Sequence, residues 1–138
     1  MKLDLDCVRD ILLGLESTLE YNDSGALSDG YTIQKLLENH HLKNYSKAQV
    51  LYTLRLMVDA KLVCFAFIPK GNDFFFKTSI GSGITFEGHQ YLASVRDSKV
   101  WSQTKRKLAS IGGTATLSFV TAVSEGVAKA LLAKTSLI

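Results

Sequence analysis

The sequence contains few of the residues that mark loop-rich or disulfide-stapled proteins. It has one proline and two cysteines among 138 residues. Scarce proline argues against an extended architecture. Cys7 and Cys64 lie in apolar contexts and have no C-x-x-C spacing, so we expect two buried, reduced thiols and no zinc. Reduced thiols in turn predict a cytoplasmic protein.

The N-terminus is not typical of a secretory signal, because Asp4 and Asp6 precede any long apolar run. The last apolar segment, residues 116–134, approaches the length of a bilayer span, which is about 20 residues. Glu125 and Lys129 fall in its middle, where a spanning helix seldom carries charge. We therefore expect no membrane association.

Catalytic and metal-binding patterns are equally sparse. The histidines are the adjacent pair His40 and His41, expected in a turn, and His89, expected to pack in or near the core. The sequence has no G-x-x-x-x-G-K-[ST] phosphate loop, no serine elbow and no H-E-x-x-H pair. We therefore expect a binding module rather than an enzyme, with no cofactor and no bound metal.

Charge, by contrast, is present and unevenly distributed. Residues 1–40 hold three Lys or Arg against eight Asp or Glu, whereas residues 41–138 hold thirteen against five, and the whole chain carries +3. An acidic start followed by a basic remainder fits a protein with one electropositive face. Ordinary solvation of the surface is the alternative explanation.

Hydrophobic periodicity predicts a mostly helical chain with one hairpin. Ser46, with Gln49 three residues later, forms the start of a capping box. On the helix that Thr85 caps, the expected inner side is formed by Phe86, His89, Leu92 and Val95. The expected helices cover residues 4–20, 33–39, 46–60, 85–96, 100–109 and 116–134, and the expected strands cover 62–68 and 74–78, joined by a turn over 69–73.

Helix-turn-helix followed by a hairpin is the order of a winged helix. The predicted fold class is therefore α+β and mostly α, a winged helix-turn-helix with a two- or three-stranded wing and additional C-terminal helices. Gly112 and Gly113 form a joint. We expect a winged-helix domain over residues 1–110 and a C-terminal amphipathic helix over residues 114–138.

Several stretches resemble a family of small proteins of unknown function from bacteria, phages and prophages. The most specific are the opening M-K-L-D-x-D-x-V-R-D-I-L, the T-x-E-G-H-x-x-L motif from Thr85, and the V-W pair at Val100. The resemblance implies a winged-helix fold and supplies no established activity. The chain departs from the family at Lys61, where glycine is common, and at Thr53, where histidine is common.

The helix that begins at Ser46 is the expected recognition helix, with Val50, Leu54 and Met57 facing the core. Gln and Arg read base edges, whereas Lys, Tyr and Thr bond phosphates. The predicted nucleic-acid-binding residues are Lys43, Lys47, Gln49, Tyr52, Thr53 and Arg55, with Lys70 and Lys77 on the wing. We expect a DNA-binding, regulator-like protein of phage, prophage or bacterial origin, with double-stranded DNA as its partner.

A protein-binding winged helix is the alternative, such as a phage protein that binds a host factor. The aromatic run 74–76 favours it, because an apolar patch suits a protein partner better than phosphates. The tail is expected to form a homodimer or higher oligomer, since the preceding domain has enough apolar residues for its own core. Folding back onto that domain is the rival. The predicted oligomerisation stripe consists of Leu117, Val120, Val123, Val127 and Leu131.

Overall fold

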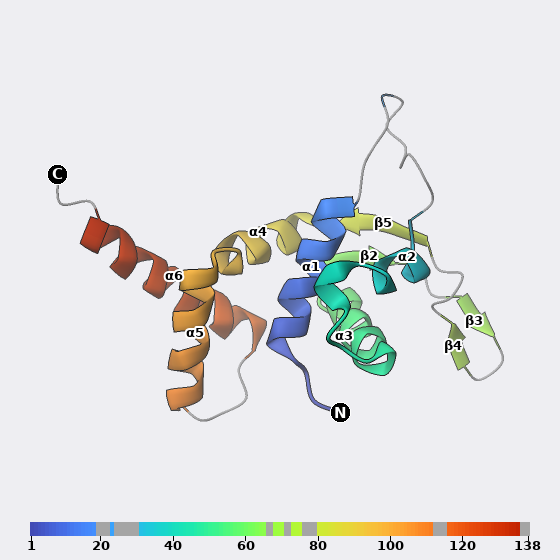
Figure 1. Cartoon of the computed structure of the whole chain (residues 1–138), viewed down its shortest axis with the longest axis horizontal. Coiled ribbons are helices and arrows are strands. Elements are labelled where there is room, and N and C mark those ends of the chain that lie inside the picture. Colours follow the sequence, from blue (N-terminus) through green and yellow to red (C-terminus); the bar gives the residue numbers. More distant parts are fainter. Residues whose placement is uncertain are drawn as a thin grey trace. The chain divides into compact units, whose positions relative to one another are not determined.

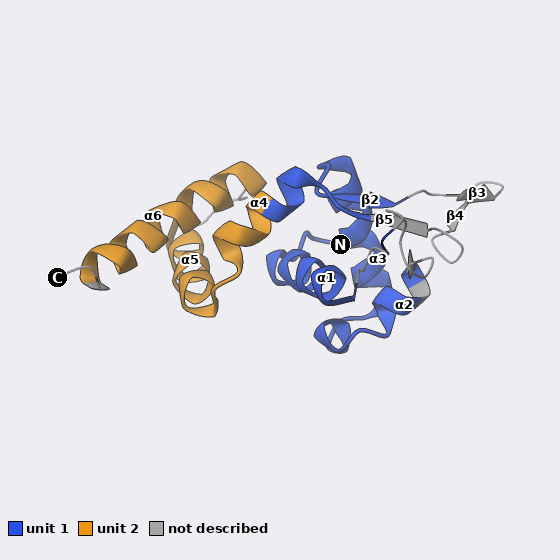
Figure 2. Ribbon diagram, turned by 90° about the horizontal axis from the view of Figure 1, so that it is seen from above, with its two compact units in different colours: residues 1–89 blue, residues 90–138 orange. Residues whose placement is uncertain are grey.

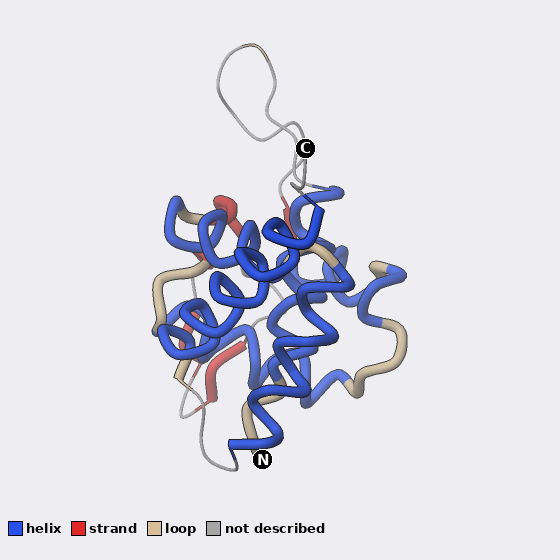
Figure 3. Tube along the Cα trace, turned by 90° about the vertical axis from the view of Figure 1, so that its left-hand side faces the viewer, coloured by secondary structure: helices blue, strands red, loops and turns tan. Residues whose placement is uncertain are grey.

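The computed structural model describes residues 1–18, 23, 31–65, 68–70, 73–75, 80–111 and 116–135. Helix predominates among them (Figure 1, Figure 3), which confirms an α+β, mostly α class. The elements, in chain order, are α1 (Leu5–Thr18), β1 (Tyr31–Thr32), α2 (Ile33–Leu37), the 3-10 helix η1 (His40–Leu42), α3 (Lys47–Asp59), β2 (Val63–Phe65), β3 (Ile68–Lys70), β4 (Asp73–Phe75), β5 (Ile80–Ile84), α4 (Phe86–Val95), α5 (Ser98–Ile111) and α6 (Leu117–Thr135).

The chain divides into two compact units, unit 1 over Met1–His89 and unit 2 over Gln90–Ile138 (Figure 2). The boundary expected near residue 110 therefore does not coincide with this division. The expected joint at 112–113 lies outside the described residues. Among the helices that the structure describes, none has both the length and the apolar character required to cross a bilayer.

The strands of unit 1 form a hairpin with a third, short strand at its edge. In the larger sheet the order is β1-β5-β2, with both outer strands antiparallel to β5. Further along the hairpin β3 pairs antiparallel with β4, with Ile68 opposite Phe75. The expected antiparallel return is thus present. The partner of β2, however, is β5 over Ile80–Ile84 rather than the strand expected over residues 74–78, and residues 68–70 and 73–75 pair with each other where a turn over 69–73 was expected.

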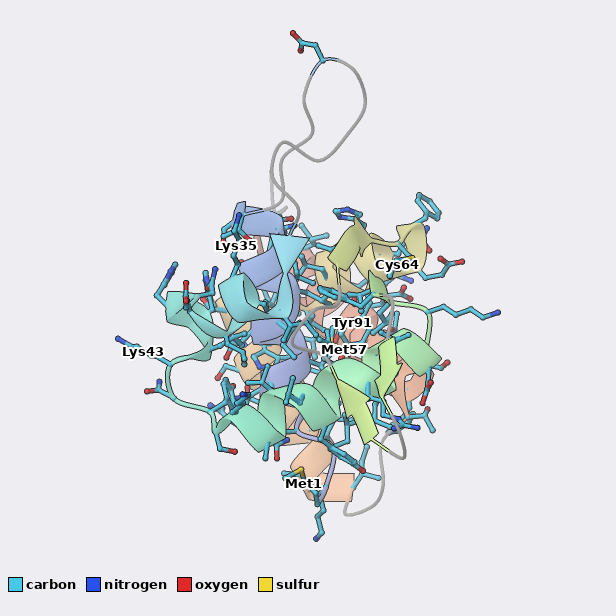
Figure 4. All side chains as sticks on the ribbon, turned by 90° about the vertical axis from the view of Figure 1, so that its right-hand side faces the viewer. Met1, Lys35, Lys43, Met57, Cys64 and Tyr91 are labelled. Carbon is cyan, nitrogen blue, oxygen red and sulfur yellow. The ribbon has the colours of Figure 1, made fainter. Side chains whose placement is uncertain are left out.

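A bulge explains how glycine fits this strand. The register of β2 against β5 shifts between Cys64 and Phe65, and Gly83, opposite Cys64, has a φ of 133°. Only glycine adopts that conformation without strain. The side chain of Cys64 is exposed, as the stick view in Figure 4 illustrates, whereas Cys7 is buried. The expectation of two buried thiols is therefore wrong for Cys64, because alternate side chains of a strand point to opposite faces.

The core of unit 1 is built from the apolar sides of α1 and α3, which pack together. Buried residues recur at helical spacing on both elements. A hydrogen bond also joins α1 to the turn before α3: the Tyr45 hydroxyl donates to Asp10 Oδ2 over 2.7 Å. The fully buried side chains of these helices include Val8, Ile11, Leu12 and Leu15 on α1, and Val50, Leu54 and Met57 on α3.

The end of α3 has the hydrogen-bond pattern of a Schellman motif. The Leu62 amide donates to the Met57 carbonyl at 2.9 Å, and the Lys61 amide donates to the Val58 carbonyl at 3.0 Å. Lys61 has a φ of 63°, the left-handed conformation that glycine adopts most easily. The motif explains why glycine would suit this position.

The start of α4 is tied to the end of α3. The Thr85 hydroxyl donates to the Lys61 carbonyl and accepts a hydrogen bond from the Gly88 amide at 3.0 Å. A Cβ at Gly88 would overlap the Leu62 carbonyl oxygen and approach Ile84 Cγ2 to 2.7 Å. Thr85 and Gly88 of the T-x-E-G-H-x-x-L motif are thus explained by this close approach.

The orientation of α4 differs from the expectation. Leu92 and Val95 are buried, as predicted, but Phe86 is 73% exposed. The expected inner position of Phe86 is wrong, because the close approach of Gly88 turns that side of the helix inward. The expectation that His89 packs in or near the core is also wrong, because His89, the last residue of unit 1, is exposed, whereas Tyr91, three residues after Gly88, is buried.

Unit 2 contains α5 and α6, which pack against each other. Asp97 caps α5, since its Oδ1 accepts from the Lys99 and Val100 amides, both at 2.9 Å. Thr116 caps α6 by accepting from the Phe119 amide at 3.1 Å. The buried residues of α5 are Val100, Trp101 and Thr104, and those of α6 are Val120, Ser124 and Val127.

Candidate nucleic-acid interface

The turn that leads into α3 is anchored to α1 by a buried amide. Asn39 Oδ1 accepts from the His41 amide at 2.9 Å and caps η1, while Asn39 Nδ2 donates to the Gly14 carbonyl at 3.4 Å. Lys43 follows η1 and is exposed (Figure 4). Lys43, a predicted phosphate contact, therefore lies on a turn that the hydrogen bonds of Asn39 hold against α1.

The start of α3 confirms the predicted cap at Ser46. Its side-chain oxygen accepts from the Gln49 amide at 3.1 Å. The Gln49 side chain, however, turns toward the protein: Nε2 lies 3.2 Å from Thr53 Oγ1 and 3.5 Å from the Lys2 carbonyl oxygen. The prediction that Gln49 faces outward for base contact is therefore wrong in this structure.

Thr53, expected on the outward side of α3, is 0% exposed. Its hydroxyl donates to the Gln49 carbonyl at 2.7 Å and accepts from Gln49 Nε2, so burial leaves no polar atom unpaired there. The prediction of a Thr53 contact with DNA is wrong. Its place inward, beside Val50 and Leu54, leaves Leu51 only half-buried.

Thr53 also forms a hydrogen bond with Cys7, a thiol whose pKa is shifted. Burial raises the pKa of Cys7 to about 11, a hydrogen bond with Thr53 lowers it, and the charges of Asp4 and Asp10 raise it. The pKa of Tyr45 is likewise raised, first by burial and then by its hydrogen bond to Asp10. Both groups stay protonated at neutral pH and act as structural hydrogen-bonding groups rather than as nucleophiles.

The remaining predicted contacts share the solvent side of α3. Lys47 and Arg55 are exposed and Tyr52 is half-buried. A lysine, a tyrosine hydroxyl and a guanidinium are groups that bond phosphates or, for Arg, guanine. Asp59 is exposed near the end of the same helix. The arrangement offers a small polar surface with cations toward its N-terminal and central turns.

The predicted wing contacts are only partly described. Lys70 is the last residue of β3, and Lys77 lies outside the described residues. Within the aromatic run, Phe74 and Phe75 belong to β4 and Phe76 lies outside the described residues. The hairpin thus places the backbone of Lys70 near its tip, opposite Asp73.

The predicted oligomerisation stripe is not free. Val120 is 0% and Val127 1% exposed within the single chain, so the expectation that these two residues await a second chain is wrong. Leu117 and Leu131 are half-buried, as is Val123. The physical reason is that α6 packs against α5. The sequence of α5 is rich in basic residues, so its apolar side is hard to recognise from composition.

The family model described as "Hypothetical protein (DUF2513)" matches residues 2–115. The chain belongs to this family. The match extends through α5 and ends before α6. Neither the curated proteins nor the solved structures contain a match to the chain. The resemblance to an uncharacterised family is thus confirmed, and function depends on the site itself.

The main feature that the site prediction missed is the basic side of α5. Lys105, Arg106 and Lys107 are consecutive and exposed on that helix. Its basic composition is visible in the sequence, but composition alone gives the run no role. Its helical spacing against Val100 and Thr104 is the signal that could have identified an amphipathic, cationic helix.

Proposed function

We propose that this chain is a non-enzymatic DNA-binding protein of bacterial or phage origin whose unit 1 is a winged helix-turn-helix. The observation that carries the proposal is the order α1, β1, α2, α3, β2, β5 together with the sheet order β1-β5-β2. In such an arrangement the helix before the hairpin is the recognition helix. That helix is α3, capped at Ser46 and packed on α1.

In this proposal α3 enters the major groove of double-stranded DNA. Arg55 reads a base edge, whereas Lys47 and Tyr52 bond flanking phosphates. Lys43, on the turn before α3, and Lys70, on the hairpin, add backbone contacts. The exposure of Lys43, Lys47 and Arg55 supports these roles. Gln49 and Thr53 are not among the proposed DNA contacts, because their side chains bond to each other.

The test is selection of a preferred duplex from random sequences, followed by binding measurements with an Arg55→Gln variant. Removal of a base contact should cost about 1–3 kcal/mol for the preferred site and relax the preference at one position. A Lys43→Gln variant is the matched control, because removal of a phosphate contact should weaken all sequences alike. A preference unchanged by Arg55→Gln would contradict the reading role of α3.

A protein-binding winged helix is the second candidate, and two observations favour it. Unit 1 has nine Lys or Arg against eleven Asp or Glu, a net charge of −2. Apolar side chains are also accessible on it, since Leu51 and Leu56 are half-buried and Phe86 is 73% exposed. Duplex affinity weaker than about 10⁻⁴ M, the limit of non-specific binding, would favour this candidate.

Self-association through α6 stays a prediction. The half-buried Leu117, Val123 and Leu131 remain partly accessible, whereas Val120 and Val127 are used within the chain. A homodimer would suit a helix-turn-helix protein, because two linked half-sites raise the effective concentration of the second contact. The molecular mass of the full chain in solution tests this, and a monomer at high concentration would contradict it.

A further inference from the structure

The two units differ in the sign of their charge. Unit 1 has the net −2 given above, whereas unit 2 carries seven Lys or Arg against two Asp or Glu, a net +5. The unit that contains α3 is therefore the acidic one. Because non-specific affinity for DNA depends on the number of cations that meet phosphates, α3 by itself is a weak electrostatic anchor.

The cations of unit 2 are concentrated on α5. This helix contains four of the seven and has no acidic residue within Ser98–Ile111. All four are exposed, while Val100, Trp101 and Thr104 are buried. Burial of those three residues fixes the rotation of the helix about its axis. The cationic residues thus presented to solvent are Lys99, Lys105, Arg106 and Lys107.

The fold also fixes this surface in place. The Asp97 cap begins the helix, α6 packs along it, and Lys105 Nζ lies 5.8 Å from the Trp101 ring centroid. The run Lys105–Lys107 lies within α5, before its last turn. The cations are therefore held on a capped helix rather than on a loop.

We propose that the exposed side of α5 binds nucleic-acid phosphates without sequence preference. This inference rests on the proposed function, to which it adds the element that provides most of the electrostatic affinity. Ser102 and Ser110 are exposed and Gln103 is half-buried on the same helix, and such side chains donate to phosphate oxygens. A membrane-surface helix needs a broad exposed apolar side, whereas Val100 and Trp101 of α5 are buried.

The test compares three forms of the full chain on a mixed-sequence duplex across a salt series. The α5 variant is Lys105→Gln/Arg106→Gln/Lys107→Gln. The matched control is Lys2→Gln/Lys35→Gln/Lys61→Gln, which removes the same charge from exposed lysines of unit 1. Emission from Trp101, the single tryptophan, checks that unit 2 stays folded in each.

The slope of log affinity against log salt should fall by about 0.9 for each phosphate that is no longer neutralised, so by roughly 2–3 in the α5 variant. Affinity near 0.1 M salt should fall by about a hundredfold, and the control should change far less. Equal decreases in the two variants would mean that only net charge matters and would overturn the inference. An unchanged slope in the α5 variant would do the same.

Two further arms separate this inference from the proposed function. If Arg55→Gln abolishes a sequence preference while the α5 variant keeps its slope, the proposed function stands and the role of α5 is wrong. If all duplexes bind alike with a slope that depends on α5, the inference stands and the reading role of α3 is wrong. Binding of the full chain to anionic phospholipid vesicles but not to duplex overturns the assignment to nucleic acid.

Discussion

Unit 1 and unit 2 are both helical, but the side-chain hydrogen bonds described here differ in the sequence separation that they span. In unit 1, side-chain hydrogen bonds join residues far apart in the sequence, such as Tyr45 to Asp10 and Thr85 to Lys61. In unit 2, Ser124 donates to Val120 and Ser94 to Tyr91, within one turn of the same helix. Such local bonds do not orient one helix against another.

The difference indicates how each unit responds to substitution. Unit 1 depends on close backbone approach at particular positions, so small changes there meet fixed atoms. Unit 2 depends on apolar contact between amphipathic helices, whose free energy follows buried area and is spread over many residues. We therefore expect single substitutions to have sharper effects in unit 1 than in unit 2.

The largest effect is expected from Gly88→Ala. The added Cβ would overlap the Leu62 carbonyl oxygen, a backbone atom that cannot move aside without breaking the α3–α4 junction. Unfolding free energy should fall by about 3 kcal/mol, the upper range for overpacking. Urea titration followed by far-UV circular dichroism measures it.

Gly126→Ala on α6 is the matched control in unit 2. A Cβ there meets nothing within 4 Å, and Gly126 lies inside an exposed part of the helix. This change should stabilise the protein by about 0.5–1 kcal/mol, since alanine is the better helix former. Equal destabilisation by Gly88→Ala and Gly126→Ala would break the contrast between the units.

The second effect is expected from Thr104→Val in unit 2. The Thr104 hydroxyl is buried and has no hydrogen-bond partner among the described residues. Valine has nearly the same shape and no polar atom to leave unpaired, so the free energy of unfolding should rise by about 1 kcal/mol. Chemical denaturation followed by Trp101 fluorescence reports on the same helix.

Thr121→Val makes the same chemical change where the hydroxyl is satisfied. Thr121 Oγ1 donates to the Leu117 carbonyl at 3.0 Å. This variant should be neutral or slightly less stable than the parent. Destabilisation by Thr104→Val that exceeds that of Thr121→Val would show that unit 2 uses the Thr104 hydroxyl, contrary to the contrast between the units.

The smallest effect is expected from Lys61→Gly. A non-glycine residue at positive φ costs about 1–2 kcal/mol, part of which is offset by the greater freedom of glycine in the unfolded chain. A net gain of about 0.5–1 kcal/mol should remain. Lys61→Ala, which removes the charge but not the strain, should give no such gain. If both variants behave alike, charge rather than backbone conformation governs this position.

Much of the architecture could be predicted from the sequence because it depends on local signals. The cap at Ser46, the break at Asp97 and the antiparallel return of the hairpin each follow from short-range chemistry. The family resemblance is confirmed over residues 2–115. These signals identify elements, but not the rotation of a helix about its axis.

The errors concern that rotation and the contacts that set it. Thr53 faces inward because Gln49 satisfies its hydroxyl, and Phe86 faces outward because Gly88 approaches Leu62. Neither pairing has a periodic signature in the sequence. Lys47 and Arg55 are exposed, as predicted, because charged side chains seldom become fully buried.

The two cysteines differ in accessibility, and this difference allows the opening of unit 1 to be timed by thiol labelling. Cys64 is accessible in the native state, whereas Cys7 is enclosed and its pKa is raised to about 11. An alkylating reagent at neutral pH therefore modifies one thiol at once and reaches the second only when α1 separates from α3. The slow phase of labelling then measures how often unit 1 opens, under conditions where nearly all molecules remain folded.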